Sequence, residues 1–282
     1  EEAARVSSIP QQIKTSVGGT LRFIIPETFS MGAGRREPGR RSNEIEKNVS
    51  LTRSFYLGEQ EISNNAFKQF DPGHDSGLLG RALLSEEDRP VVNVSWEDAI
   101  RFCNWLSEKD SLPVAYALKD GQWRLRSPVT IGYRLPTEAE WAWTARYAAG
   151  KQPTRFPWGD TMPPTAGSGN YADISAASMV PYSIKGYNDN FRGPAPSGTY
   201  APNELGIFDL AGNVSEWISD YYSVELHRKT LVDPLGPTQG DYYVIRGSNY
   251  THGRFSELRW TFRDYGSDPR PDVGFRIARF VE

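Results

Sequence analysis

Cysteine, histidine and long apolar runs are scarce in this chain of 282 residues. Its single cysteine, Cys103, excludes an intrachain disulfide, and its three histidines are widely spaced without an H-x-x-x-H pattern. No apolar run approaches the roughly 20 residues that a membrane span needs. A formal net charge of −3 gives no field that would hold nucleic acid or an anionic membrane. We therefore expect no nucleic-acid partner and no direct membrane span in this chain.

Aromatic and turn-forming residues, in contrast, are abundant. With 8 Trp, 14 Tyr and 13 Phe, the chain has enough apolar area for a large core, and 26 Gly and 20 Pro indicate many turns. A single domain of this length needs no disulfide to bury its core. We expect residues 1–20 to be a linker or the tail of an N-terminal region, and residues 21–282 to form the domain.

Two segments carry clear helix-start signals. Ser95 is followed by Asp98, and Thr137, directly after Pro136, is followed by Glu140, so that each pair has the spacing of a capping box. Behind the first box the apolar residues fall on one helical face: Trp96, Ala99, Ile100, Cys103 and Leu106. This spacing predicts that Cys103 is a small, buried core residue.

The rest of the chain has the pattern of short strands and loops. Residues 21–32 alternate and then break at Gly32, as a strand entering a turn would, and residues 54–70 predict a strand followed by a helix capped near Ser63. From residue 156 onward, aromatic-rich stretches alternate with Gly, Pro, Asn and Asp without helical periodicity. The pattern indicates an α+β domain with two main helices, short antiparallel strands and a high content of irregular structure.

Four blocks point to a known family: YRLPTEAEWAWTAR at 133–146, ELGIFDLAGNVSEW at 204–217, VIRGSNY at 244–250 and DVGFRIA at 272–278. In this order they resemble the formylglycine-generating-enzyme (sulfatase-modifying factor) family, whose fold is C-type-lectin-like and recurs in the C-terminal half of the ergothioneine-pathway sulfoxide synthases. The resemblance runs from about Phe29 to the C-terminus. It implies a single domain of this fold.

A calcium site is expected in the second of these blocks. Long loops need local cross-links to stay ordered, and bound metal is the candidate where disulfides are excluded. Calcium takes six to eight oxygens, several of them carbonyls of an irregular segment. Asp209 and Glu216 are two carboxylates seven residues apart around a glycine turn. The resemblance implies that their side chains bind calcium together with the carbonyls of Gly212 and Val214.

The resemblance implies a second calcium site as well. It would use Asp189 and the carbonyl of Phe191, with the remaining ligands from Asn170 and Tyr171 or, under a different gap, from Asp173 and Ile174. The alternative for all of these acids is that they cap turns.

The segment 246–262, RGSNYTHGRFSELRWTF, determines the expected chemistry. In active members of the family it carries two cysteines that bind copper(I), an ion that soft thiolates suit. Counted from the glycine of the RGS turn, these positions are His252 and Glu257, neither of which replaces a thiolate. A tryptophan beside the family's active cleft is Ser215 here, and the first serine-type position is Asn249. We expect no copper and no formylglycine-generating activity.

Two functions stay open. In the first, this is a calcium-stabilised module of an extracytoplasmic bacterial protein, in the periplasm or at the cell surface, that binds a protein or small ligand in a cysteine-free cleft lined by Ser215, Asn249, Tyr250, His252, Glu257 and Trp260. In the second, it is an oxidase of the pyoverdine-maturation type that acts on a small peptide-derived substrate in the same cleft. The acid–base candidates would then be His252, Glu257, Tyr250 and Glu61.

The C-terminal arginines favour neither function. Arg246, Arg259, Arg263, Arg276 and Arg279 interleave with aromatic residues. An alternating strand, with the aromatics inward and the arginines paired to Asp264, Asp268 or Asp272, explains this pattern without nucleic acid.

Overall fold

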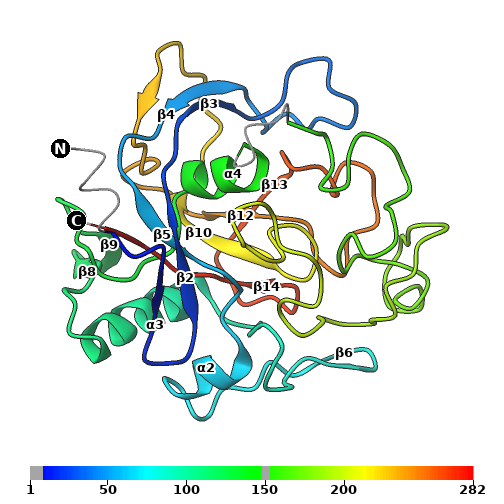
Figure 1. Ribbon diagram of the computed structural model, residues 1–282, viewed down its shortest axis with the longest axis horizontal. Helices are drawn as coiled ribbons and strands as arrows, with labels where there is room; N and C mark the ends of the chain where they lie inside the picture. Colours follow the sequence, from blue (N-terminus) through cyan, green and yellow to red (C-terminus); the bar gives the residue numbers. More distant parts are fainter. Residues whose placement is uncertain (1–8, 148–152, 282) are drawn as a thin grey trace.

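The computed structural model describes residues 9–147 and 153–281 (Figure 1). The described part contains three helices: α2 (Asn64–Lys68), α3 (Trp96–Lys109) and α4 (Glu138–Arg146). None of them has the length and apolar character required to cross a membrane. The remainder consists of short strands joined by long irregular segments, and the expected α+β class with two main helices is confirmed.

The predicted helix caps are present. The Ser95 hydroxyl accepts a hydrogen bond from the backbone N–H of Asp98, and the Thr137 hydroxyl accepts one from Glu140, each at 3.1 Å. In both cases the carboxylate of the third residue accepts the backbone N–H of the cap in return, which completes a capping box. The short helix α2 is capped by Ser63, as predicted.

Two four-stranded sheets form the centre of the fold. The first has the order β1 (Gln12–Lys14), β2 (Thr20–Ile24), β5 (Phe55–Gly58) and β15 (Ala278–Phe280). The second has the order β13 (Arg263–Gly266), β12 (Tyr243–Arg246), β10 (Ser215–Tyr221) and β14 (Val273–Gly274). Most pairings are antiparallel, as expected, but β14 runs parallel to β10. Both sheets therefore join segments that are far apart in the sequence.

Smaller sheets surround this centre. One has the order β11 (Leu231–Val232), β4 (Lys47–Ser50) and β3 (Thr28–Met31), in which β11 runs parallel to β4. Two hairpins are formed by β6 (Leu78–Leu79) with β7 (Ala82–Leu83), and by β8 (Tyr116–Lys119) with β9 (Gln122–Leu125). The strand expected over 21–32 is divided at Pro26, because β2 and β3 belong to different sheets.

The N-terminal boundary of the domain lies before residue 21. Strand β1, which falls in the segment 1–20 that the sequence predicts to be a linker, pairs with β2 over three residues. Ile9, Ile13 and Val17 pack against the main core. Part of that segment therefore belongs to the folded domain, because its apolar residues cover one edge of the first sheet.

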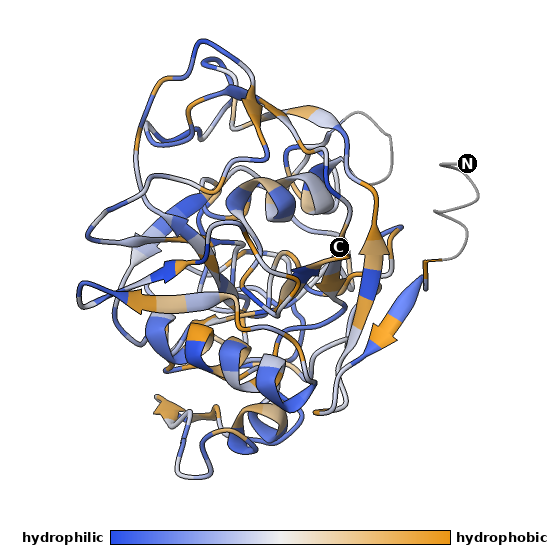
Figure 2. Cartoon of the chain, turned by 90° about the vertical axis from the view of Figure 1, so that its left-hand side faces the viewer, coloured by the Kyte–Doolittle hydropathy of each residue, from blue (hydrophilic) through white to orange (hydrophobic). Residues whose placement is uncertain are grey.

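Helix α3 packs its apolar face onto the main core. Its predicted inward residues are all buried, and Cys103 has no exposed surface. Hydrophilic residues dominate the visible side of this long helix in Figure 2. The second core cluster lies under α4 and includes Trp141, which is also fully buried. The two helices thus cover two cores that share the central strands.

Buried arginines, rather than exposed ones, dominate the C-terminal third. Arg246 and Arg263 both bind Glu138 of α4, at 2.9 and 2.6 Å, and Arg259 binds Glu44. The expected pairing with Asp264, Asp268 or Asp272 is wrong for these arginines, because they turn inward towards carboxylates of distant segments. Asp264 and Asp272 pair instead with Arg270.

Candidate functional site

Two carboxylates of the second expected calcium site lie against each other. Asp173 is fully buried and accepts the backbone N–H of Asp189 at 2.5 Å, while Asp189 is 9% exposed. The hydroxyl of Ser175 donates to Asp173 and stands 2.8 Å from the carbonyl oxygen of Phe191, to which it also bonds. Asp173, Asp189 and the Phe191 carbonyl therefore form one connected group of oxygens.

Backbone N–H groups satisfy both carboxylates of this group: Asp173 accepts those of Ser175 and Ala176, and Asp189 accepts those of Phe191 and Tyr171. Burial raises the pKa of Asp189 to about 7, backbone N–H groups of Phe191 and Tyr171 act to lower it, and the charge of Asp173 raises it further. Neither Asp173 nor Asp189 has an arginine or lysine partner among the ion pairs of the described residues. A cation at this place would remove the repulsion between the two carboxylates.

Of the two gap alternatives, the geometry brings together Asp173 and Asp189. The amide nitrogen of Asn170 donates to the carbonyl of Gly193 at 2.9 Å and to Asn213 at 3.3 Å. Its amide oxygen is buried and has no hydrogen-bond partner within the described part of the chain. Tyr171 donates its backbone N–H to Asp189, so this alternative pair also adjoins Asp189. The side chain of Ile174 is 69% exposed.

The first expected site is built differently. Glu216 lies on β10 and accepts hydrogen bonds from Arg276 at 2.6 and 2.8 Å and from the indole of Trp141 at 3.0 Å. The side chains of Glu216 and Arg276 are 1% and 0% exposed. Two guanidinium hydrogen bonds and one indole hydrogen bond therefore already compensate the charge of Glu216, whether or not calcium binds.

Asp209, the other expected side-chain ligand of this site, lies seven residues before Glu216 at the start of the loop 209–216. One of its carboxylate oxygens accepts the backbone N–H of Gly198 at 2.8 Å, and its backbone has a φ of 54°. Burial raises its pKa to about 6, the Gly198 hydrogen bond and Arg276 act to lower it, and Glu216 raises it further. Between the two acids, Gly212 has a φ of +87°, and a Cβ there would lie 2.9 Å from the carbonyl oxygen of Asn170. Val214 is buried behind this turn.

The residues predicted to line a ligand cleft are mostly packed against one another. Asn249 is fully buried, and its amide nitrogen donates to the hydroxyl of Ser215 at 2.8 Å and to Asp272 at 3.0 Å. Ser215 itself donates to the carbonyl of Gly247. The ring of Tyr250 is buried, with its hydroxyl bonded to the carbonyl of Pro271. These contacts make a polar cluster inside the fold.

The two residues at the cysteine positions have different surroundings. His252 is 9% exposed, and its Nδ1 has no hydrogen-bond partner in the part of the chain that is described. Burial lowers the pKa of His252, and the charges of Glu257 and Asp272 act in the opposite direction. Glu257 lies 3.7 Å from Arg41 in a partly exposed ion pair. Neither arrangement resembles a pair of soft metal ligands.

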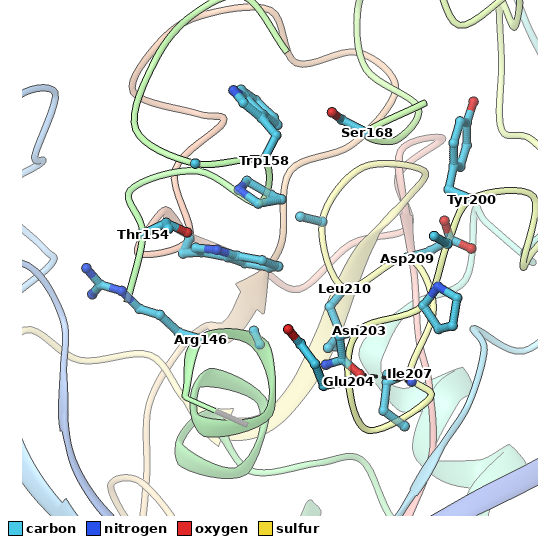
Figure 3. A pocket seen from close by; sticks show the side chains of 17 residues that line it. Arg146, Thr154, Trp158, Ser168, Tyr200, Asn203, Glu204, Ile207, Asp209 and Leu210 are labelled. Carbon is cyan, nitrogen blue, oxygen red and sulfur yellow. Dashed lines mark hydrogen bonds between the residues drawn. The ribbon is translucent and has the colours of Figure 1, made fainter. Parts of the chain in front are cut away.

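A pocket of about 600 Å³ opens beside the Asp209 loop, the first expected calcium site, and is lined by Trp260, the remaining residue of the predicted cleft. Its walls come from the C-terminal end of α4, the segment 154–168 and the segment 200–211. In Figure 3, Tyr200 and Asp209 lie along one side, Asn203 and Glu204 at one end, Trp158 and Ser168 at the other, and Arg146 opposite Asp209. Asp209 is thus both a residue of the loop and part of a pocket wall.

A second pocket of about 330 Å³ involves Glu61. It is formed by the turn between β1 and β2 and by residues 58–66. The Glu61 carboxylate is 3% exposed and accepts hydrogen bonds from Ser197 and Asn213. Burial and the neighbouring charge of Asp209 raise its pKa well above the usual range. Glu61 lines the second pocket and Asp209 lines the first, and the two carboxylates belong to one buried group of acids.

This arrangement of helices and small sheets defines a known class of α+β folds. Treponema denticola variable protein 1 shares it, with a TM-score of 0.76, 25% identity, and coverage of 96% of this chain and 99% of its own. The family model described as "Sulfatase-modifying factor enzyme 1-like domain" matches residues 9–281, and the chain belongs to this family.

Two curated relatives cover the chain to different extents. The formylglycine-generating enzyme of Mus musculus is 34% identical over 178 residues, which are 63% of this chain and 38% of the enzyme. The chain therefore matches about two fifths of the length of that enzyme. The chaperone protein LppX of Paenibacillus barcinonensis is 27% identical over 254 residues, which are 85% of this chain and 84% of LppX.

Sequence reasoning missed three residues that the structure places at these sites. Asp272 belongs to the buried cluster around Asn249, and Arg276 holds Glu216. Both stand in the DVGFRIA block, whose charged residues within an apolar stretch signal buried ion pairs. Trp158 lines the large pocket, and its position in the loop motif FPWGD was the available signal.

Proposed function

We propose that this domain is a calcium-stabilised binding or accessory module without formylglycine-generating activity, in a protein that works outside the cytoplasm. The observation that carries the proposal is the position of Cys103: the only thiol of the chain is buried in the α3 core. The family's copper chemistry needs two thiolates on one metal ion, and His252 and Glu257, at the two cysteine positions, supply none. The name of LppX, a chaperone protein, agrees with an accessory role.

The calcium part of the proposal rests on the group around Asp173 and Asp189. All donors there are oxygens, two of them carboxylates and one a carbonyl, which is the set that calcium prefers. No three His, Cys, Asp or Glu side chains of the described residues converge as a ligand set, so the remaining ligands would be carbonyls or water. When bound, calcium would cross-link the loops 170–175 and 189–191. The Asp209 loop is a second candidate, with its carboxylate and the carbonyls of Gly212 and Val214 as ligands.

Thermal unfolding with and without chelator tests the calcium proposal. Loss of a metal that binds only the folded state lowers stability by RT ln(1 + [L]/Kd), about 2.7 kcal/mol at a hundredfold excess over Kd. We expect chelation to lower Tm by several degrees, with recovery in calcium and less recovery in magnesium, which demands strict octahedral geometry. Asp189→Asn should reproduce the loss without chelator, whereas the exposed Asp268→Asn should not. Identical melting curves in calcium and chelator would refute it.

The activity part has its own assay. A sulfatase-type cysteine peptide incubated with the protein and copper should keep its thiol, as measured by mass spectrometry. Formation of formylglycine would overturn the proposed function. Fractionation of the source cells tests the location, and a full-length native protein found only in the cytosol would contradict it. Extracellular calcium modules have Kd values on the order of 10⁻⁴ to 10⁻³ M, which suits a calcium-rich compartment.

One observation favours the alternative, an oxidase that acts on a small peptide-derived substrate. Glu61 combines burial, a raised pKa and a position at a pocket, which is the setting of many catalytic acids. If Glu61 is a proton carrier, Glu61→Gln should abolish turnover of such a substrate and leave Tm within a few degrees. A variant that loses stability but not turnover would assign Glu61 to the structure alone.

A further inference from the structure

The pocket of about 600 Å³ differs in position and character from the cleft that the sequence predicts. It shares Trp260 with that cleft, but Ser215, Asn249 and Tyr250 are buried elsewhere in hydrogen-bonded contacts. Its volume lies within the range of 300–1,000 Å³ that is usual for small-molecule sites. This pocket is therefore a separate site from the predicted cleft.

Aromatic rings supply one half of the pocket's chemistry. Trp158 and Trp260 both line it, and both are only partly buried. The indole N–H of Trp158 donates to the carbonyl of Thr161, and Phe156 stacks on its ring at 5.0 Å, so the indole is held in place. Tyr200 adds a third ring, whose hydroxyl has no hydrogen-bond partner in the described segments. Fixed electron-rich rings of this kind attract cations.

Negative charge supplies the other half. Asp209 is 8% exposed and lines the pocket. Of the Asp209 carboxylate, one oxygen accepts the Gly198 N–H, and the other receives no hydrogen bond from the described residues. Behind Asp209 stand the carboxylates of Glu61 and Glu216, and the cationic side chain that reaches this group is Arg276.

Arg146, the arginine among the described residues of the pocket wall, does not cancel this charge. Arg146 donates to the carbonyl of Gly32 at 2.9 Å and lies 3.6 Å from Glu37. In Figure 3 its guanidinium extends away from Asp209 and Tyr200. The Asp209 side of the pocket therefore combines a carboxylate short of partners with aromatic surfaces.

From this geometry we propose that the pocket between α4, the segment 154–168 and the segment 200–211 binds an organic cation, an ammonium or guanidinium group carried on a larger body. The carboxylate of Asp209 faces the charged group, and Trp158, Tyr200 and Trp260 surround the part that carries it. The pocket is larger than a bare ammonium group, which leaves room for that body. This inference rests on the proposed binding function and names the ligand class and site for it. It is compatible with calcium at Asp173 and Asp189, and it is the alternative to calcium at Asp209.

Two pairs of probes distinguish the possible sources of the cation. Choline represents a small ammonium compound, and its uncharged isostere is 3,3-dimethylbutan-1-ol. The peptide Ac-Gly-Arg-Gly-amide represents a protein partner, and its uncharged isostere replaces arginine by citrulline. Binding is read from the indole N–H signals of Trp158 and Trp260 in nitrogen-15 NMR spectra, assigned with Trp158→Phe and Trp260→Phe. Trp105, on α3 outside the pocket, is the control signal.

We expect at least one charged probe to shift the Trp158 and Trp260 signals with a Kd on the order of 1 mM or tighter, and to leave Trp105 unchanged. Its uncharged isostere should bind at least about tenfold more weakly. Asp209→Asn keeps an acceptor for Gly198 and should weaken the charged probe about tenfold, whereas Asp268→Asn should have no effect. Trp158→Leu provides a second variant that leaves the carboxylate in place and should also weaken binding.

Several results would overturn the inference. Equal binding of charged and uncharged probes would make the pocket a neutral site, and binding that Asp209→Asn does not change would move the site elsewhere. Displacement of choline by calcium chloride alone, with the same loss in Asp209→Asn, would make the pocket a metal site. Absence of binding by both cations would remove the ligand class. The proposed function is tested by the cysteine-peptide assay and by chelation, and none of these binding results affects either test. Failure of the inference is therefore distinct from failure of the proposed function.

Discussion

The Glu216 carboxylate can stabilise the fold in two ways, as the ion-pair partner of Arg276 or as a calcium ligand. If Glu216 acts mainly through Arg276, Glu216→Gln removes the carboxylate that is hydrogen-bonded to a fully buried guanidinium and leaves only the neighbouring charges of Glu61 and Asp209. Breaking one side of a buried ion pair costs about 3–5 kcal/mol. The three hydrogen bonds to the Glu216 carboxylate, from Arg276 twice and from Trp141, all favour the upper part of this range.

The loss is measured by chemical denaturation and by thermal unfolding. A shift of about 2–3 °C per kcal/mol for a domain of this size corresponds to a Tm lower by about 6–15 °C. The control is Glu257→Gln, whose ion pair with Arg41 is partly exposed at 3.7 Å and should contribute less than about 1 kcal/mol. Arg276→Met combined with Glu216→Gln should destabilise less than the sum of the single changes, because the two side chains contact each other.

Unfolding measured in calcium and in chelator distinguishes the ion-pair role of Glu216 from a metal-ligand role. An ion-pair role predicts the same loss for Glu216→Gln in calcium and in chelator, since Arg276 is present in both. A metal-ligand role predicts a loss that is large in calcium and absent after chelation. The reasoning from the buried pair is refuted if the variant and the wild type unfold identically once calcium is removed.

The remaining predictions concern the core. Burial raises the pKa of the Cys103 thiol far above its usual range, so a thiol reagent should label the native protein only as fast as it unfolds, and rapid labelling would contradict the position of α3. Burial, followed by the charge of Glu138, raises the pKa of Asp220 to about 7. Because this value exceeds the unfolded value of about 3.9, the stability from Asp220 is full below about pH 4 and is lost as pH rises through about 7, by about 3–4 kcal/mol. Asp220→Asn keeps an acceptor for the backbone N–H of Glu138 and should flatten this decline in urea unfolding between pH 4 and 8; parallel profiles for the two proteins would show that Asp220 is not its source.

Local signals in the sequence were sufficient for the helices and for the class of fold. The capping boxes at Ser95 and Thr137 are complete within four residues, and the buried face of α3 repeats with helical period, so no distant contact is needed to recognise them. The family motifs then define the fold, since they contain α4, reach the strands β10, β12 and β14 of the second sheet, and end at the start of β15 in the first. The start of the domain was placed too late because β1 has three residues and no pattern of its own.

The site was less accessible from sequence, because its pairings join distant segments. Nothing near Glu216 indicates that Arg276 binds it across 60 residues, or that Arg246 and Arg263 share Glu138 of α4. Asp173 could be named only as an alternative to Asn170, since the length of the intervening loop does not determine which residue meets Asp189. The large pocket is lined by the end of α4 and by the segments 154–168 and 200–211, and no single motif contains it.

The pairing of β5 with β15 has a consequence for the order in which the chain can fold during synthesis. Residues 55–58 reach their neighbours at 278–280 only after almost the whole chain has been made. The same holds for the charges, because Glu44, Glu138 and Glu216 precede Arg259, Arg263 and Arg276, which neutralise them. A growing chain therefore carries inward-facing acids without partners, which opposes early collapse around them. Native packing is therefore completed late in synthesis, and a chain that ends before the DVGFRIA block leaves both central sheets unfinished.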